Sequence, residues 1–402
     1  MGRSENAIKR KILLLVSLLS NLGLLGYFKY GNFLLENFSA WCATIGFNFH
    51  PLATNIILPI GISFYTFASL SYTVDVYRKE IRSDWKFTDY ALFVSFFPHL
   101  VAGPIVRASQ LLPQIEHPQL PTKNEIGRGF MLVFFGLFSK VVMADALFAP
   151  LVDQAYQPLA RPALLDAWIA VLSFSGQIYY DFSGYSLCAI GLAMVFGFRF
   201  PDNFRGPYGA VSFTDFWRRW HISLSTWLRD YLYIPLGGNR NGRFRTYLAI
   251  FMTMLIGGLW HGASWMFVLW GGLHGAYLVM EKVAQHFATP KPVFRIGKSC
   301  FIFLIVTLTW IPFRSSSPHQ AFEIIRGLIN VDELGQVDLP KILAVLIMGL
   351  TVRWHILMKG MRFDFVVQKN SATVAVVSGV LAMVSLFLFS SGNSNAFIYF
   401  QF

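Results

Sequence analysis

Charged residues are scarce in this chain. Only 13% of its 402 residues are Asp, Glu, Lys or Arg, whereas a soluble globular protein carries about 25%. Hydrophobic residues make up 55% of the sequence, and the mean hydropathy is +0.50. This composition argues against an ordinary soluble enzyme and indicates a protein that lies in a lipid bilayer.

Cysteine is also rare, and the three that occur, Cys42, Cys188 and Cys300, are widely spaced. Such spacing fits neither a disulfide framework nor a metal site, so we expect all three to pack as small apolar side chains. The sequence has no Walker loop, dinucleotide-binding fingerprint, HExxH motif or GxSxG elbow. The sequence therefore shows none of these catalytic motifs.

Long apolar runs are abundant: ten occur between residues 12 and 390. Several approach the roughly 20 residues that cross a hydrocarbon core, and others are interrupted by Gly and Pro. We expect an all-α polytopic membrane protein with about eight to ten transmembrane helices plus re-entrant and interfacial helices. The predicted single membrane domain, residues 1–402, divides into amino-terminal helices (12–198), a cytoplasmic or interfacial segment (199–245), a histidine region (246–282) and carboxyl-terminal helices with an aromatic tail (283–402).

The net charge of +12 is best explained by membrane topology. Lys and Arg collect in cytoplasmic loops, and they are absent from residues 36–54 but frequent in residues 76–88 and 199–245. The basic residues that precede the first apolar run place the amino end in the cytoplasm. No nucleic-acid-binding module is visible, so we expect no nucleic-acid partner.

Residues Phe216–Tyr233 have the pattern of an amphipathic helix. At about 100° per residue, large apolar side chains share one arc and arginines lie opposite. The apolar arc consists of Trp217, Trp220, Leu224, Trp227, Leu228 and Tyr231. Aromatic residues at the headgroup level with arginine on the wet face predict one interfacial helix here, which ends before Pro235.

His261 lies in the most informative stretch of the chain. From Thr246 to Met280 there is no Asp, Glu, Lys or Arg, and Gly257, Gly258 and Gly262 surround the histidine. A polar side chain inside a bilayer is costly and usually functional, and imidazole can exchange a proton near neutral pH. A catalytic histidine and a packed, hydrogen-bonded histidine both stay open on this evidence.

Other polar residues of the apolar regions are weaker candidates. His221 lies at the edge of the amphipathic arc, where its spacing favours an interfacial position near lipid headgroups over a functional role. His274, thirteen residues after His261, points to another side of a continuous helix, and His99 follows a helix-breaking proline. Asp181 lies within an apolar run, where an acid is expensive unless it is paired. It could orient a histidine, pair with an arginine or cap a broken helix.

Several motifs occur in an order that resembles the membrane-bound O-acyltransferase (MBOAT) family. The resemblance is to its bacterial branch that O-acetylates alginate and related polysaccharides and, more distantly, to the D-alanine exporter of teichoic acid synthesis. It runs from about residue 22 to the carboxyl end. The motifs are Leu58-Pro59-Ile60-Gly61-Ile62-Ser63-Phe64-Tyr65, Phe97-Pro98-His99-Leu100-Val101-Ala102-Gly103-Pro104, Asp181-Phe182-Ser183-Gly184-Tyr185, Phe216-Trp217-Arg218-Arg219-Trp220-His221-Ile222-Ser223, Leu236-Gly237-Gly238-Asn239-Arg240 and Leu259-Trp260-His261-Gly262.

The resemblance implies a reaction. His261 matches the catalytic histidine of the family, which a funnel through the bilayer would reach from opposite sides. His221 matches the second histidine of the family, near the cytoplasmic entrance. The acyl donor would be a thioester in the cytoplasm, namely acetyl-CoA, and His261 would act as general base on an acceptor hydroxyl. The resemblance implies neither a metal nor a bound cofactor. Trp217, Trp260, Asp181 and Asn239 would bind substrate or support the site. The implied partners are membrane lipids and, beyond the bacterial inner membrane, a periplasmic acetyltransferase or relay protein and a polysaccharide export complex.

Two departures from the family pattern leave alternatives. Members of the alginate branch begin with further membrane helices ahead of the matched region, and this chain is expected to lack them. Its aromatic end resembles that of a small peptide accompanying the teichoic-acid exporter, so Tyr399 could lie near the funnel or act as an interfacial anchor. A proton-coupled transporter or flippase and an inactive scaffold of an export complex remain the rival functions.

Overall fold

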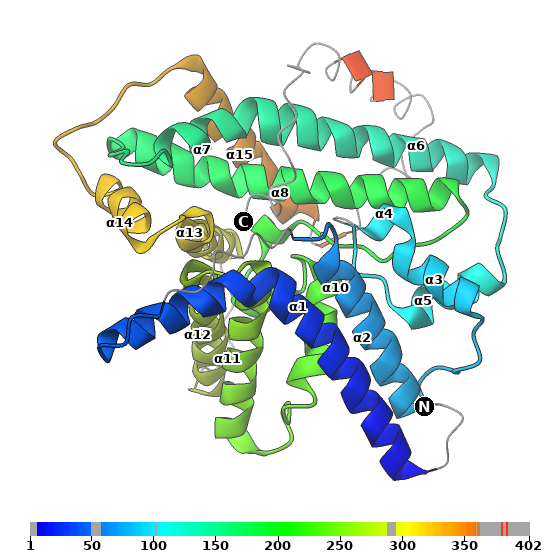
Figure 1. Ribbon diagram of the computed structural model, residues 1–402. Coiled ribbons are helices and arrows are strands. Elements are labelled where there is room, and N and C mark those ends of the chain that lie inside the picture. The colour runs from blue at the N-terminus through cyan, green and yellow to red at the C-terminus, as the bar shows by residue number, and fades with distance from the viewer. Residues whose placement is uncertain are drawn as a thin grey trace.

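All regular secondary structure in the described part of the chain is helical (Figure 1). The computed structural model describes residues 6–49, 58–100, 103–287, 295–358, 360–361, 379–380 and 383–384. Within these ranges, five helical stretches are long and apolar enough to cross a membrane. They are Ala7–Thr44, Lys123–Ala155, Leu164–Val195, Arg295–Arg314 and Leu339–Met358. The all-α membrane fold is thus confirmed, whereas a total of eight to ten crossings stays a prediction.

Two long helical stretches lie side by side and run antiparallel (Figure 1). One is α8 (Leu164–Val195). The other runs through α6 (Lys123–Leu137), the π-helical η1 (Phe138–Phe148) and α7 (Ala149–Ala155) without a break. A Thr122 capping box starts α6, because its hydroxyl accepts from the Glu125 amide while the Glu125 carboxylate accepts from the Thr122 amide.

A buried ion pair joins this helical pair. Lys140 Nζ of η1 lies 2.6 Å from Asp181 Oδ1 of α8 and 2.8 Å from Asp145 Oδ1. Pairing is what makes such charges tolerable in an apolar environment. The cation that binds Asp181 is therefore a lysine, where the sequence analysis considered a histidine, an arginine or a helix end.

The amino-terminal third contains one long helix and several short ones. α1 (Ala7–Thr44) is followed by α2 (Ile62–Arg78), α3 (Phe87–Ser95), α4 (Phe97–Leu100) and α5 (Ala108–Glu116). The predicted break beside Pro98 is confirmed, because α3 ends at Ser95 and α4 begins two residues later.

The predicted single helix over Phe216–Tyr233 is wrong. The chain forms the 3-10 turn η2 (Pro207–Gly209), α9 (Phe213–Trp217), α10 (Ile222–Leu228) and the π-helical η3 (Arg229–Tyr233). His221 interrupts the series with φ of 43° and ψ of 54°, a left-handed conformation that no α-helix continues. Nor is the arginine face wet throughout, because Arg219 is buried and pairs with Asp215 at 2.8 Å.

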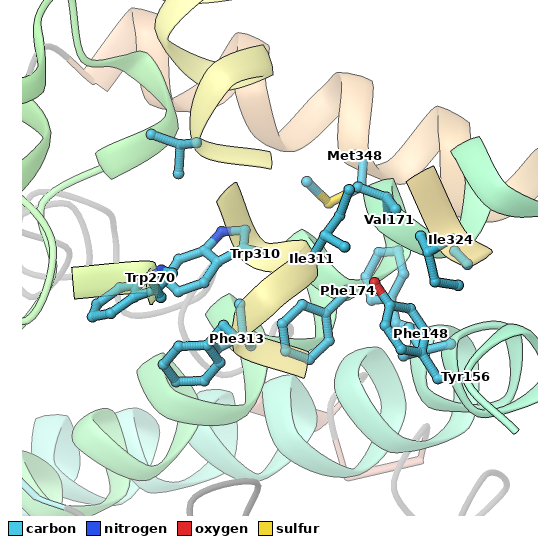
Figure 2. Close-up of a cluster of buried hydrophobic side chains, with 14 of the residues drawn as sticks. Phe148, Tyr156, Val171, Phe174, Trp270, Trp310, Ile311, Phe313, Ile324 and Met348 are labelled. Carbon is cyan, nitrogen blue, oxygen red and sulfur yellow. The ribbon is translucent and has the colours of Figure 1, made fainter. Parts of the chain in front are cut away.

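In the described part of the chain five helices remain, and all but the first of them contribute residues to the largest apolar core. They are α11 (Gly242–His261), α12 (Trp265–Phe287), α13 (Arg295–Arg314), α14 (Pro318–Gly327) and α15 (Leu339–Met358). Figure 2 shows Trp270 of α12 beside Trp310 and Phe313 of α13, and the two indole rings stack 5.6 Å apart. Phe174 of α8 extends this cluster, which fixes α12 and α13 against α8.

The basic segments gather at one end of the molecule. Arg78, at the end of α2, donates to the Asp230 carbonyl oxygen at 3.2 Å. Arg10, near the start of α1, donates to the Tyr77 carbonyl oxygen. Figure 1 shows the start of α1, the end of α2 and the start of α11 at the same end. This arrangement agrees with the prediction that all three segments lie on one side of the membrane.

Candidate active site

His261 is the last residue of α11. Gly262, with φ of −166° and ψ of 158°, is extended and stops the helix, and α12 begins at Trp265. The histidine is 5% exposed, although it lies at a break in helical structure. The turn between α11 and α12 thus places an imidazole inside the protein.

Aromatic rings surround His261. Its ring centroid lies 5.0 Å from Trp260, 5.1 Å from Trp270 and 5.3 Å from Phe313, each time nearly edge to face. Such packing holds the imidazole in one orientation. It also keeps bulk water away from the ring.

His221 is held by Asn203. Its Nδ1 lies 3.1 Å from Asn203 Oδ1, and the same oxygen accepts from the Ser223 hydroxyl at 2.9 Å and from the Ser223 amide at 3.3 Å. The Asn203 carbonyl oxygen accepts from the Ile222 amide at 3.0 Å. One asparagine therefore stabilises the unusual left-handed turn at His221 through both its side chain and its backbone.

These contacts define the chemical state of His221. Because Asn203 Oδ1 accepts, Nδ1 carries the proton and Nε2 keeps its lone pair. Burial lowers the pKa of His221 to about 3, so the imidazole is neutral at pH 7. Within the described residues, Nε2 is buried and has no hydrogen-bond partner. His221 is thus prepared to accept a hydrogen bond.

The two histidines share one neighbour, Trp260. His221 and His261 lie with ring centroids 6.1 Å and 5.0 Å from this indole. The structure therefore brings together the two histidines that the sequence analysis selected. His274 lies 4.8 Å from Trp270 and 5.1 Å from Trp217, and Trp270 is also a neighbour of His261. The assumption of one continuous helix through both histidines is wrong, because α11 ends at His261 and His274 belongs to α12.

The other predicted site residues are dispersed. Trp217 packs on Trp270, one ring away from His261. Asp181 lies next in sequence to Phe182, whose ring contacts His221 at 4.5 Å, but its carboxylate binds Lys140. Asn239 lies at an exposed turn, where its Oδ1 accepts from Tyr233 and Lys282. The Tyr399 prediction lies outside the described residues.

A cavity of about 410 Å³ lies between α6, α8 and α15. Its lining includes Asn203 and Ser186, whose side chains hydrogen-bond at 3.1 Å. Neither His221 nor His261 belongs to this lining in the described part of the chain. The cavity reaches Asn203, the residue that holds His221. A funnel that reaches His261 from both sides stays a prediction.

A second cavity, of about 480 Å³, lies among the basic segments, and its charged lining consists of Arg78, Arg107 and Arg240 together with Glu80 and Asp230. Tyr231 separates two of the arginines, with Arg78 and Arg107 over its ring at 5.5 Å and 5.3 Å. Arg107 binds Asp230 at 2.7 Å. Burial acts to raise the pKa of Asp230, but hydrogen bonds from Arg229 and Arg107 outweigh it and lower the pKa.

A continuous series of aromatic rings connects this basic cavity with the histidines. Tyr231 lies 4.9 Å from Trp227, which stacks on Phe67 at 3.9 Å. Phe67 stacks on Trp260 at 5.1 Å, and Trp260 contacts His261. Residues from α2, α10, η3 and α11 thus form one aromatic column between the arginines and the site.

Sequence reasoning missed three buried or partly buried polar residues, Lys29, Lys140 and Asn203. Lys29 and Lys140 each interrupt an apolar run, and a lone lysine in such a run is a signal that could have been used. Asn203 had no such signal, because it lies among other polar residues between α8 and α9. Its importance follows only from its position beside His221.

Replacing Asn203 by leucine tests whether the His221 turn depends on it. The variant Asn203→Leu leaves the buried Ser223 hydroxyl and amide without their acceptor, and each such loss costs about 1–3 kcal/mol. We expect a lower melting temperature. We also expect turnover to be at least about tenfold slower, because His221 would lose the contact that positions it. Asn124→Leu, at an exposed position of α6, is the matched control and should change neither. Normal stability and turnover in Asn203→Leu would contradict the assignment.

The fold and the site together define a class. This is an all-helical membrane protein that buries two histidines around one tryptophan, with a basic cavity at the far end of an aromatic column. The model of the membrane-bound O-acyltransferase family matches residues 12–312. The chain belongs to the membrane-bound O-acyltransferase family.

Similar proteins with assigned roles come from several bacteria. The probable alginate O-acetylase AlgI of Azotobacter vinelandii is 45% identical over 322 residues, which are 80% of this chain and 63% of that protein. The peptidoglycan O-acetyltransferase of Helicobacter pylori is 38% identical over 366 residues, 84% of this chain and 68% of that protein. The teichoic acid D-alanyltransferase of Bacillus subtilis is 25% identical over 245 residues, 57% of this chain and 60% of that protein. The chain thus spans less than two thirds of the alginate-related relative.

Proposed function

We propose that this protein is an O-acetyltransferase that moves an acetyl group from a cytoplasmic thioester across the bacterial inner membrane. The acceptor is a hydroxyl that serves the O-acetylation of an exported polysaccharide such as alginate. Family membership and the names of the similar proteins support the reaction class. The donor we propose is acetyl-CoA.

The observation that carries this proposal is the aromatic column between the basic cavity and His261. Arginines suit the phosphates of a coenzyme A donor, because guanidinium groups bind phosphate through paired hydrogen bonds. Arg78, Arg107 and Arg240 line the cavity, and Trp227, Phe67 and Trp260 lead away from it. A pantetheine arm that follows this column would bring its thioester toward the two histidines.

His261 is proposed as the general base. Its imidazole takes the proton of the acceptor hydroxyl while the hydroxyl oxygen attacks the thioester carbonyl carbon. The carbon–sulfur bond then breaks, and the imidazolium returns the proton to the leaving thiolate, so that an ester and a free thiol result. His221, neutral and with a free Nε2 lone pair, would accept a hydrogen bond from the donor near its entry.

Purified protein in liposomes tests the proposal. With labelled acetyl-CoA on one side and alginate oligosaccharides on the other, we expect labelled ester on the sugar and an equal amount of released CoA thiol. Empty liposomes and an acceptor without hydroxyl groups are the controls. Neither ester nor thiol above the empty-liposome level would reject the acetyltransferase. Sugar uptake driven by a proton gradient, without thiol release, would instead support the transporter alternative.

A further inference from the structure

We propose that α1 positions the catalytic histidine, with Lys29 and Tyr30 as positioning residues that hold the last turn of α11. The inference rests on the proposed function, because it assigns these residues to the reaction through His261. It concerns a helix that contributes neither histidine, and it gives a role to a lysine within an apolar span.

The end of α11 has carbonyl groups that need partners. The last four carbonyl oxygens of any α-helix lack an intrahelical donor, and α11 ends at His261. Tyr30 Oη donates to the Leu259 carbonyl oxygen at 2.8 Å, and Lys29 Nζ donates to the Trp260 carbonyl oxygen at 2.5 Å. Two consecutive residues of α1 thus satisfy the two carbonyl groups directly before the histidine.

Lys29 is held toward the protein rather than extended along the membrane. Its ammonium group also donates to Ser63 Oγ of α2 at 3.2 Å and lies 5.4 Å from the centre of the Trp260 ring. A lysine in a hydrocarbon environment is costly unless it is bound. Here its positive charge meets the negative end of the α11 dipole, where a cation is stabilising.

A third contact fixes the other side of the same turn. Trp265, the first residue of α12, donates its indole N–H to Asn37 Oδ1 at 2.8 Å. Asn37 lies about two helical turns after Lys29 on α1. The helix therefore crosses the joined ends of α11 and α12 (Figure 1) and binds the chain both before and after His261.

The consequence is geometric control of both histidines. Trp260 is the ring that His221 and His261 share, and its carbonyl oxygen is the one that Lys29 binds. If the last turn of α11 unwinds or rotates, Trp260 and His261 move together. A displacement of about 1 Å at a reacting group can slow a reaction about 100-fold.

Lys29→Met, Lys29→Arg and Tyr30→Phe test the proposal in the full-length chain. We expect Lys29→Met to lower kcat about 10- to 100-fold while KM for acetyl-CoA stays within about twofold. Lys29→Arg, which keeps a cationic donor, should recover most of the lost rate, and Tyr30→Phe should lie between. Lys11→Met, at an exposed position of the same helix, is the matched control and should behave as wild type.

Backbone hydrogen exchange gives a readout that does not depend on activity. In Lys29→Met, peptides covering residues 257–264 should exchange about fivefold faster or more, as expected for one lost hydrogen bond, while those of α8 stay unchanged. Unchanged exchange in this stretch would reject the capping role, whatever the rates are. A rise in KM alone, or a kcat that falls only as the folded fraction falls, would also reject the positioning role.

The two proposals fail in different ways. If His261→Gln retains wild-type turnover, the general-base assignment fails, and exchange in Lys29→Met still reports whether α1 caps the turn. If His261→Gln is inactive but Lys29→Met has normal kcat and normal exchange, only the positioning role fails.

Discussion

Replacing His261 by glutamine should lower acetyl transfer about 1,000-fold. General acid–base catalysis contributes about 10²- to 10⁴-fold, and glutamine fills the ring of aromatic neighbours without a group that takes a proton near neutral pH. Because His261 packs against Trp260, Trp270 and Phe313, glutamine also avoids the void that alanine would leave. The measurement is ester formation and thiol release by the purified variant in liposomes.

The control for this variant is a histidine of the same chain with no contact to the site. His319 of α14 is 71% exposed in its side chain and approaches Glu323 only at 3.9 Å. His319→Gln should therefore retain full activity. If His261→Gln were folded and turned over within tenfold of wild type, His261 would be a packing residue and the base would have to be found elsewhere.

Replacing Gly258 by alanine should have the largest effect on folding. At this position α11 touches α12 backbone to backbone: an added Cβ would collide with the Phe267 carbonyl oxygen and lie 2.8 Å from Gly271 Cα. Small residues allow such close approach between membrane helices. Overpacking costs about 1–3 kcal/mol and occasionally more, and no flexible side chain can yield here. We expect about 3 kcal/mol of destabilisation and a marked loss of folded protein.

The neighbouring glycine provides the control. An added Cβ at Gly257 meets only the end of the Leu228 side chain, at 3.0 Å, and this methyl group can shift. Gly257→Ala should therefore keep a melting temperature close to wild type, and alanine favours helix more than glycine does. Thermal unfolding in detergent, followed by size-exclusion chromatography, compares the two variants. Equal stability of Gly257→Ala and Gly258→Ala would refute the close contact between α11 and α12.

The class of fold and the principal histidine were predictable from the sequence. A low charge content with long apolar runs requires that backbone groups be satisfied within helices. The stretch from Thr246 to Met280 has no charged residue, and glycines surround His261 within it. A polar side chain in such a stretch is costly in a bilayer and usually has a function. Both signals are local, so the chain order alone reveals them.

The prediction for Phe216–Tyr233 failed for a physical reason. The apolar spacing is helical, but the pattern cannot show that Asn203, thirteen residues before this segment, accepts three hydrogen bonds around His221. Those bonds stabilise a left-handed residue that divides α9 from α10. A tertiary contact therefore overrode a local periodicity, and the segment became part of the interior instead of an interfacial helix.

The sequence by itself determined that this is a helical membrane protein of the O-acyltransferase family, with His261 in an uncharged stretch among glycines and His221 in a tryptophan–arginine motif. Only the tertiary structure decided that the imidazole rings of His221 and His261 both contact Trp260. It also decided that the Asn203 side chain places the proton of His221 on Nδ1 and that Lys29 binds the Trp260 carbonyl oxygen. The reason is separation along the chain. Lys29 and Trp260 are 231 positions apart, and spacing rules within one helix do not reach across such a distance.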